Sequence, residues 1–418
     1  MTMNQQLNSL KEFQLVRLTG DIHPWGVRRH AVHRRGSLGQ VGQRQRPSKD
    51  SVESVSALTQ MIRLPITIEI RAGALNDLSS ILASQGLSTS GNIGVVVSPG
   101  SGKAIAQRLA PVLPNARWHT VTDCTLDSAV QLAEQMRSGR YDVVVGIGGG
   151  KIVDTAKYAA AQIGLPLVAV PTNLAHDGIC SPVSILDSDA GRSSYSVPIP
   201  IIVIVDLDVI RQSPSRFVAA GIGDTVSNIS AIADWDLSHQ ETKEPLNRLS
   251  ITMAHTAAQS LLHHPGTLQD DGLLTILAES LVVSGIAMNI AGSSRPCSGG
   301  CHEISHALDI LFPGRNALHG EQVGIGAAFA TYLRGDSEMA GRIAECLSRH
   351  SLPITAAEIG FSDEEFAQAV LFAPQTRPGR YTILEHLDLS LDTIRDAYAD
   401  YVKAASSVNK NHVELVKI

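Results

Sequence analysis

Cysteine is scarce in this sequence and shows no paired spacing. The five cysteines are odd in number; they are Cys124, Cys180, Cys297, Cys301 and Cys346. This usage is typical of reduced thiols and argues against a disulfide scaffold. We therefore expect a cytoplasmic protein.

Long apolar runs and an excess of positive charge are also absent. We find no run of the roughly 18 apolar residues that a membrane span needs; the run 201–205, for example, ends at Asp206. The formal net charge is −6, so the surface as a whole does not suit nucleic acid. We predict a small-molecule substrate, no nucleic-acid partner and no membrane span.

The sequence does have the composition of a compact enzyme. A chain of 418 residues is long enough for two domains with substantial cores. Of these residues, 44% are hydrophobic, 18% are charged and 35 are glycine. Residues 1–60 differ, with nine Lys or Arg against four Asp or Glu and little hydrophobic periodicity. We expect residues 1–60 to be a disordered basic extension, with the functional chain starting near Met61; a targeting peptide or a binding tail are the alternatives.

Residues 61–208 alternate between strand and helix patterns. This succession predicts a doubly wound, Rossmann-like α/β domain, which binds ligands at the carboxyl ends of its strands. A β-hairpin is expected over 183–196, around an Asp-Ala-Gly turn. The expected strands are 66–70, 92–98, 118–121, 142–147, 166–170 and 201–205, and the expected helices are 75–85, 103–113, 127–138 and 152–163.

A glycine-rich turn follows the apolar strand 142–147. Its residues are Gly146, Ile147, Gly148, Gly149, Gly150 and Lys151, and they open the helix 152–163. Glycines let backbone N–H groups approach a pyrophosphate, and the helix N-terminus adds its positive dipole end. The turn lacks the GxGxxG fingerprint, and a turn without a ligand is the alternative. We predict a phosphate cradle for a dinucleotide.

From Pro214 the pattern becomes helical, which predicts an all-α second domain over 209–418. Asp224 follows a glycine pair and precedes the apolar stretch 226–235. Its ordinary role would be an N-cap of that helix. Together with the histidines downstream, we favour Asp224 as a metal ligand.

Three histidines gather in the stretch 293–324. His302 and His306 are four residues apart, so on a helix they leave the same face, and His319 follows a Pro-Gly turn. Imidazole is a common ligand of zinc-like ions, and an open catalytic site needs about three protein ligands. Surface or core histidines are the alternative for any one of them.

Six segments jointly resemble the sn-glycerol-1-phosphate dehydrogenase family, within the superfamily of iron-containing alcohol dehydrogenases, glycerol dehydrogenase and 3-dehydroquinate synthase. They lie in the family's order and cover about residues 62–390. The resemblance implies a dehydroquinate synthase-like architecture with the active site between the α/β and helical domains, and homodimers or higher homo-oligomers. The segments are GIGGGKIVDTAK, VPTNLAHDGICSPVS, AAGIGDTVSN, RPCSGGCHEISHALD, ALHGEQVG and RPGRYTIL.

The resemblance also implies roles for individual residues. The metal ligands are Asp224, His302 and His319, and Asp177 and His306 contact the substrate. Catalysis would thus rest on Asp177, Asp224 and His306. The residues implied to bind NAD or NADP are Gly148, Gly149, Gly150, Lys151, Val153, Thr172, Asn173, Ala175 and Ser181.

The activity implied is metal-dependent, NAD(P)-linked reduction of dihydroxyacetone phosphate to sn-glycerol 1-phosphate. The ion is Zn²⁺ or, with similar ligands, Fe²⁺. Cys301 stands where the family commonly has an acid, and Asn173 and Leu174 replace small residues, which leaves the substrate open. The alternatives are a dehydrogenase of another polyol or a cyclase that uses NAD without net redox change. The phosphate site of the substrate is not located; Arg295, Arg377 and Arg380 are candidates only, and ordinary surface pairing is the role expected of each.

Overall fold

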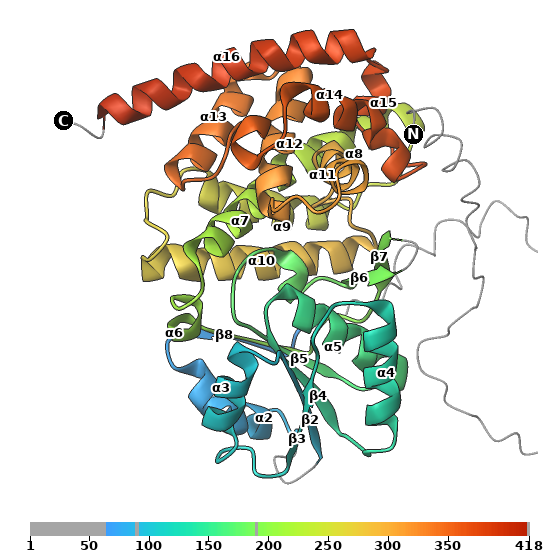
Figure 1. The fold of residues 1–418 in the computed structure, drawn as a ribbon, viewed down its shortest axis with the longest axis vertical. Coiled ribbons are helices and arrows are strands. Elements are labelled where there is room, and N and C mark those ends of the chain that lie inside the picture. Colours follow the sequence, from blue (N-terminus) through green and yellow to red (C-terminus); the bar gives the residue numbers. More distant parts are fainter. Residues whose placement is uncertain (1–63, 88–91, 189–190, 416–418) are drawn as a thin grey trace, which may run out of the picture. The chain divides into compact units, whose positions relative to one another are not determined.

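The computed structural model describes residues 64–87, 92–188 and 191–415, so the predicted extension 1–60 lies outside the described residues. The first part is built on a six-stranded sheet of order β1-β8-β5-β4-β2-β3, with every neighbouring pair parallel (Figure 1). Its strands are β1 (Thr67–Arg71), β2 (Ile93–Val97), β3 (Ala116–Thr120), β4 (Val143–Gly148), β5 (Leu167–Pro171) and β8 (Ile202–Asp206).

The sheet is covered on both faces, which explains its apolar strands. Every residue of β2, β4, β5 and β8 is buried, as Val- and Ile-rich strands of a parallel sheet require. Val95 and Val145 join one core cluster with helix α2, whereas Val96 and Val144 join another with α4 and α5. The helices are α2 (Leu78–Ser84), α3 (Ser101–Leu109), α4 (Leu126–Arg137) and α5 (Gly150–Ile163).

These elements confirm the predicted doubly wound fold. The expected hairpin is present as β6 (Val183–Ser188) and β7 (Gly191–Ser196), an antiparallel pair. Strand β2 lies between β3 and β4, so the strand order reverses at the β2–β4 pair. A ligand crevice is expected at this switch point, outside the carboxyl ends of the strands.

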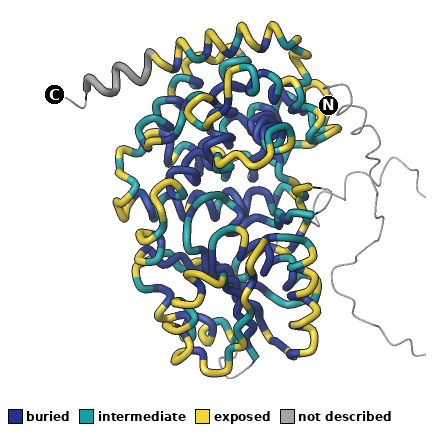
Figure 2. The backbone as a smooth tube through the Cα atoms, viewed as in Figure 1, coloured by how far each residue is buried: buried dark blue, intermediate teal, exposed yellow. Residues whose placement is uncertain are grey.

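From residue 207 onward the described chain is helical, as expected (Figure 1). Its largest buried cluster joins residues of α7, α9, α10, α12, α13 and α16, and dark buried backbone runs through it in Figure 2. The boundary predicted after residue 208 falls inside the short α6 and stays a prediction. The helices are α6 (Leu207–Ile210), α7 (Ser215–Val226), α8 (Asn228–Thr242), α9 (Arg248–Leu262), α10 (Asp271–Ala291), α11 (Gly300–Leu311), α12 (His319–Leu333), α13 (Ser337–Arg349), α14 (Asp363–Phe372), α15 (Ile383–Leu387) and α16 (Leu391–Leu415).

Helix α10 has the length and hydropathy of a membrane span, although the sequence holds no uninterrupted apolar run of that length. It is 21 residues long, and its most apolar 18-residue window has a mean hydropathy of 1.8. However, 72% of that window is buried, and Leu274, Leu277 and Leu281 belong to the helical core. A helix that is apolar all round is what the centre of a helical domain requires.

Asp224 does not begin a helix, contrary to the N-cap interpretation. It lies in the last turn of α7, and α8 begins only at Asn228. Gly221 and Gly223 lie inside α7, where their missing side chains leave room for neighbouring backbone. A Cβ at Gly221 would lie 1.9 Å from Leu174 O, and one at Gly223 would lie 2.2 Å from Gly320 O.

Candidate metal and cofactor site

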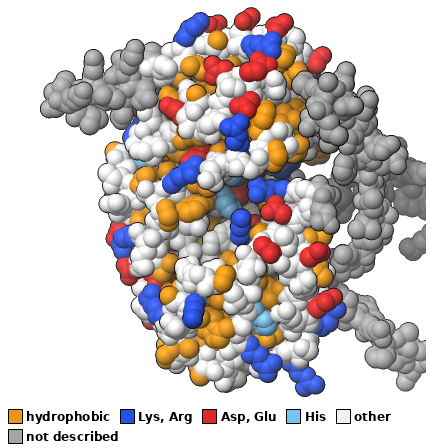
Figure 3. Space-filling view, viewed as in Figure 1, with side chains coloured by type: hydrophobic (Ala, Val, Ile, Leu, Met, Phe, Trp, Pro, Cys, Tyr) orange, Lys and Arg blue, Asp and Glu red, His pale blue; other side chains and the backbone are white. Residues whose placement is uncertain are grey.

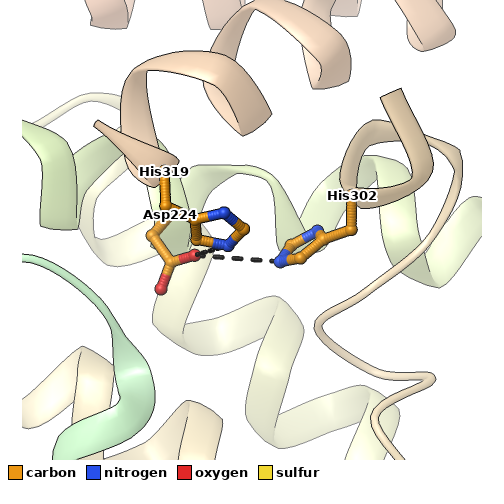
Figure 4. Close-up of side chains that lie close together, drawn as sticks. All are labelled: Asp224, His302 and His319. Atoms are coloured by element: carbon orange, nitrogen blue, oxygen red, sulfur yellow. Dashed lines mark ion pairs between the residues drawn. The ribbon is translucent and has the colours of Figure 1, made fainter. Parts of the chain in front are cut away.

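Asp224, His302 and His319 converge although they come from three different helices, α7, α11 and α12 (Figure 4). One ligand atom from each lies within 4.8 Å of the others. Asp224 Oδ1 is 3.8 Å from His302 Nε2 and 3.7 Å from His319 Nε2. The two separations from Asp224 are within the roughly 4.4 Å that two ligands can span around one ion at metal–ligand distances of up to roughly 2.2 Å.

The close crossing of α7 and α12 brings Asp224 and His319 together. A Cβ at Gly320 would lie only 1.8 Å from Ala220 O, so no larger residue fits there without moving a backbone. His319 is the first residue of α12 and directly precedes this glycine. The glycine contact therefore holds the imidazole beside the last turn of α7.

A hydrogen-bond chain determines which nitrogen of His319 is free. Ser305 Oγ donates to Gln322 Oε1 at 2.6 Å, so its oxygen can accept from His319 Nδ1, 3.1 Å away. The proton of the neutral ring is then on Nδ1, and the lone pair of Nε2 faces Asp224. Such a partner on the second ring nitrogen fixes the tautomer of a metal-binding histidine.

Cys301 orients His302 as Ser305 orients His319. Its Sγ lies 3.3 Å from His302 Nδ1 and 3.9 Å from Ser227 O, so the thiol can accept from the ring and donate to the carbonyl. Burial raises the pKa of Cys301 to about 12, which keeps the thiol protonated. Cys301 thus lies at Nδ1 of His302, whereas Asp224 faces Nε2 of the same ring. Its thiol is therefore not placed to be a fourth metal ligand.

The charge state of the cluster suits a cation. Asp224 is 4% exposed, and burial, followed by the nearby charge of Asp177, raises its pKa. Burial lowers the pKa of His302 and lowers that of His319 to about 3, so both rings are neutral. A buried carboxylate beside two neutral imidazoles lacks a positive partner, and a divalent ion would supply it. The residues present therefore fit such an ion.

His306 lies one turn after His302 on α11 and is half-buried. Burial lowers its pKa well below the ordinary value, and the positive charge of Arg377 lowers it further. His306 is not among the residues whose ligand atoms meet at Asp224. The structure thus separates the histidine implied to contact substrate from the two implied to bind metal.

The glycine turn and the loop after β5 face each other. A Cβ at Gly149 would lie 2.8 Å from Asn173 Nδ2, and one at Gly150 would lie 2.2 Å from His176 Nε2. Glycine is needed here because any side chain would fill the space between the N-terminus of α5 and that loop. Thr172, Asn173 and Ala175 are half-buried beside this space, and Lys151 is exposed.

Two residues implied to contact the nucleotide already form hydrogen bonds within the protein. Val153 is fully buried, and its N–H donates to Gly149 O at 3.2 Å. Ser181 is 3% exposed, and its hydroxyl donates to Val183 O at 3.2 Å. Neither presents a free polar group to a nucleotide in this conformation.

A buried ion pair that was not predicted from the sequence supports the loop. Lys157 Nζ lies 2.8 Å from Asp154 Oδ1 and donates to Gly178 O at 2.9 Å, and it also contacts Val183 O. Both residues are buried on α5. The signal was an acid and a lysine three residues apart on an otherwise apolar helix, which is unusual in a core.

Comparison with known proteins gives one consistent set of relatives. The model of the iron-containing alcohol dehydrogenase family matches residues 69–214. A glycerol-1-phosphate dehydrogenase [NAD(P)+] of Nitrosopumilus maritimus is 38% identical over 293 residues, which are 69% of this chain and 82% of that protein. One from Hyperthermus butylicus is 34% identical over 77% of this chain and 93% of its own length.

Solved structures share the fold at lower identity. Glycerol dehydrogenase of Schizosaccharomyces pombe superposes with a TM-score of 0.69 at 20% identity, over 84% of this chain and 93% of that chain. A probable glycerol dehydrogenase of Sinorhizobium meliloti gives 0.68 at 21% identity, over 82% and 98%. These likenesses confirm the predicted architecture.

Proposed function

The chain belongs to the glycerol-1-phosphate dehydrogenase family, and from this premise we propose that it catalyses the reversible NAD(P)-linked reduction of dihydroxyacetone phosphate to sn-glycerol 1-phosphate. It is an oxidoreductase that acts on a small molecule. The observation that supports this proposal best is the meeting of Asp224, His302 and His319, with Asp224 hydrogen-bonded to the loop that faces the glycine cradle.

In this proposal Asp224 Oδ1, His302 Nε2 and His319 Nε2 hold a divalent ion. When bound, the ion supplies a Lewis acid for the carbonyl oxygen, and the nicotinamide supplies the hydride. A carboxylate with two imidazoles suits Zn²⁺, which is our first choice, and Fe²⁺ uses similar ligands. Ser305 and Cys301 keep the two metal-facing nitrogens unprotonated.

The remaining residues orient the substrate and carry the proton. The imidazole of His306 leaves α11 on the same face as that of His302, so it can pass a proton to the oxygen of the reduced carbon. Asp177 lies in the loop after β5, and its carboxylate would accept hydrogen bonds from substrate hydroxyl groups.

The backbone N–H groups of Gly149 and Gly150 at the start of α5 would bind the pyrophosphate, with Lys151 and the loop residues Thr172, Asn173 and Ala175 beside it. The turn after β2 contains no acid to bind a ribose 2′-hydroxyl, and the exposed Lys103 on α3 would favour a 2′-phosphate. Both NADH and NADPH therefore belong in the assay.

A substrate screen tests the proposal. Purified protein, with zinc and iron measured in the same preparation, is given dihydroxyacetone phosphate, dihydroxyacetone and other polyol-derived ketones with each nicotinamide. We expect oxidation of NAD(P)H with dihydroxyacetone phosphate and formation of the sn-1 product. Preference for a plain ketone would instead assign a polyol dehydrogenase, and phosphate release without NAD(P)H consumption would assign a cyclase.

A further inference from the structure

Two neighbouring arginines, Arg377 and Arg380, have no acidic ion-pair partner in the part of the chain that the structure describes. They follow the turn Ala373–Thr376, and both are half-buried. Among the residues that the structure describes, no Asp or Glu forms an ion pair with either, whereas Arg295 pairs with Glu244. Burial lowers the pKa of Arg377. Burial, and after it the charges of Arg377 and Arg295, lowers the pKa of Arg380 to about 10. Two half-buried guanidinium groups side by side, without an ion-pair partner among the described residues, would be stabilised by an anion between them.

Their hydrogen bonds hold them against the segment that leads into α11. Arg377 Nη1 donates to Ser298 Oγ at 2.8 Å and to Ser294 Oγ at 3.3 Å. Arg380 Nη2 donates to Ser294 Oγ at 2.9 Å, and its Nη1 donates to Ser298 O. Because both serine hydroxyls accept from arginine, their own protons remain for a ligand.

The charge of the buried acid Glu303 acts on both arginines, but Glu303 does not pair with them directly. Its Oε2 accepts a hydrogen bond from Thr382 Oγ1 at 3.1 Å, and it forms no ion pair with Arg377 or Arg380 in the described part of the chain. Arg295 is also committed, since it donates to Tyr381 O at 2.9 Å as well as to Glu244. Of the three arginines considered from the sequence, only Arg377 and Arg380 therefore remain available.

The arginine pair lies at the candidate site. Ser298 precedes His302 by four residues, and the charges of Arg377 and Arg380 both reach His306. Figure 3 shows histidine surface in a hollow of the face drawn, with Lys and Arg side chains beside it. An anion held by the arginines would thus be close to the ion held by Asp224, His302 and His319.

We propose that Arg377 and Arg380, with the hydroxyls of Ser294 and Ser298, bind the phosphate group of the substrate and make the enzyme select a phosphorylated ketone. This inference rests on the function proposed above. Guanidinium forks match phosphate oxygens with paired, charge-assisted hydrogen bonds, and the two hydroxyls add neutral donors. The substrate would be anchored by its phosphate at one end and its carbonyl oxygen at the other.

The test compares Arg377→Gln, Arg380→Gln and Ser298→Ala with the control Arg395→Gln, which removes an exposed arginine paired with Glu364. Each variant is assayed with dihydroxyacetone phosphate and dihydroxyacetone, and inorganic phosphate is titrated as a competitive inhibitor. We expect each arginine variant to lose about 100-fold or more in kcat/KM for the phosphorylated ketone, mainly through KM. Bound metal should stay within about threefold, the rate with plain dihydroxyacetone should fall far less than the rate with its phosphate, and inhibition by phosphate should weaken in parallel.

Several results would overturn the inference. Equal losses on both ketones with intact metal content would assign the arginines a structural role. The arginine variants could fail to fold, and Ser298→Ala then serves as the test. If a folded Ser298→Ala protein keeps wild-type kinetics and wild-type inhibition by phosphate, this serine segment does not bind the phosphate. Wild-type protein that reduces dihydroxyacetone but not its phosphate would end the inference while leaving a metal-dependent dehydrogenase. Wild-type protein that reduces neither would reject the proposed function itself.

Discussion

The backbone N–H of Asp177 donates a 2.9 Å hydrogen bond to Oδ2 of Asp224. Asp177 follows β5 of the α/β part, and Asp224 lies in the last turn of α7 of the helical part. The other carboxylate oxygen, Oδ1, faces His302 and His319. One hydrogen bond therefore links the loop beside the glycine cradle to the candidate metal ligands.

Replacing the carboxylate tests the metal site. Asp224→Asn keeps the shape of the side chain but removes the negative charge that a divalent ion needs. We expect purified protein with little bound metal and kcat/KM lowered by roughly 1000-fold. Metal per chain and steady-state rates measure this. The control Asp208→Asn alters an exposed acid paired with Arg211 and should change neither; a metal-replete, fully active Asp224→Asn protein would contradict the assignment.

Removing the hydroxyl that orients His319 should weaken metal binding without abolishing it. In Ser305→Ala, the ring loses the partner of Nδ1 and no longer keeps one tautomer. We expect metal affinity to fall roughly 10- to 100-fold, as for other partners of ligating histidines. Competition with a chelator measures the affinity. Ser260→Ala, on the exposed side of α9, is the matched control, and equal affinities of the two variants would argue against the hydrogen-bond chain.

A methyl group at the glycine cradle should weaken nucleotide binding and leave metal binding unchanged. In Gly150→Ala the new Cβ meets the ring of His176, and overpacking of this kind costs about 1–3 kcal/mol. We expect KM for NAD(P)H to rise roughly tenfold, with metal content unchanged. Gly341→Ala, whose Cβ would meet nothing within 4 Å, should leave KM as it is. Loss of metal with unchanged KM would show that the turn serves the fold instead.

Acid should destabilise the protein partly through His350. Burial, followed by the charges of Arg349 and His264, lowers its pKa from 6.5 to about 4, and its Nε2 has no partner among the described residues. Above pH 6.5 the ring is neutral both folded and unfolded. Between pH 6.5 and 4 only the unfolded chain takes up the proton, so stability falls as pH falls, by about 1–2 kcal/mol at pH 5.

Urea unfolding at pH 7.5 and pH 5 measures this effect. The loss of unfolding free energy between the two pH values should be smaller in His350→Leu than in the wild type. His255→Leu, which removes an exposed histidine, should keep the wild-type difference. An unchanged difference in His350→Leu would show that other groups cause the acid sensitivity.

The sequence by itself determined the elements and most of the chemistry. Short runs of Val and Ile bounded by turn residues indicated strands buried on both faces, so the parallel sheet, its covering helices and the glycine turn after β4 were predictable. The spacing of His302 and His306 determined that both imidazoles leave one side of a helix. The family resemblance supplied the expected metal set, because its segments recur in a fixed order.

Only the tertiary structure decided how these residues act together. Asp224 lies beside His319 because α7 and α12 cross closely at Gly223 and Gly320, a contact that no local pattern encodes. The free nitrogens of His302 and His319 depend on Cys301 and Ser305, and the choice between three arginines depends on where Glu244 lies. Each is a contact between side chains brought together by packing, and packing is a property of the whole chain.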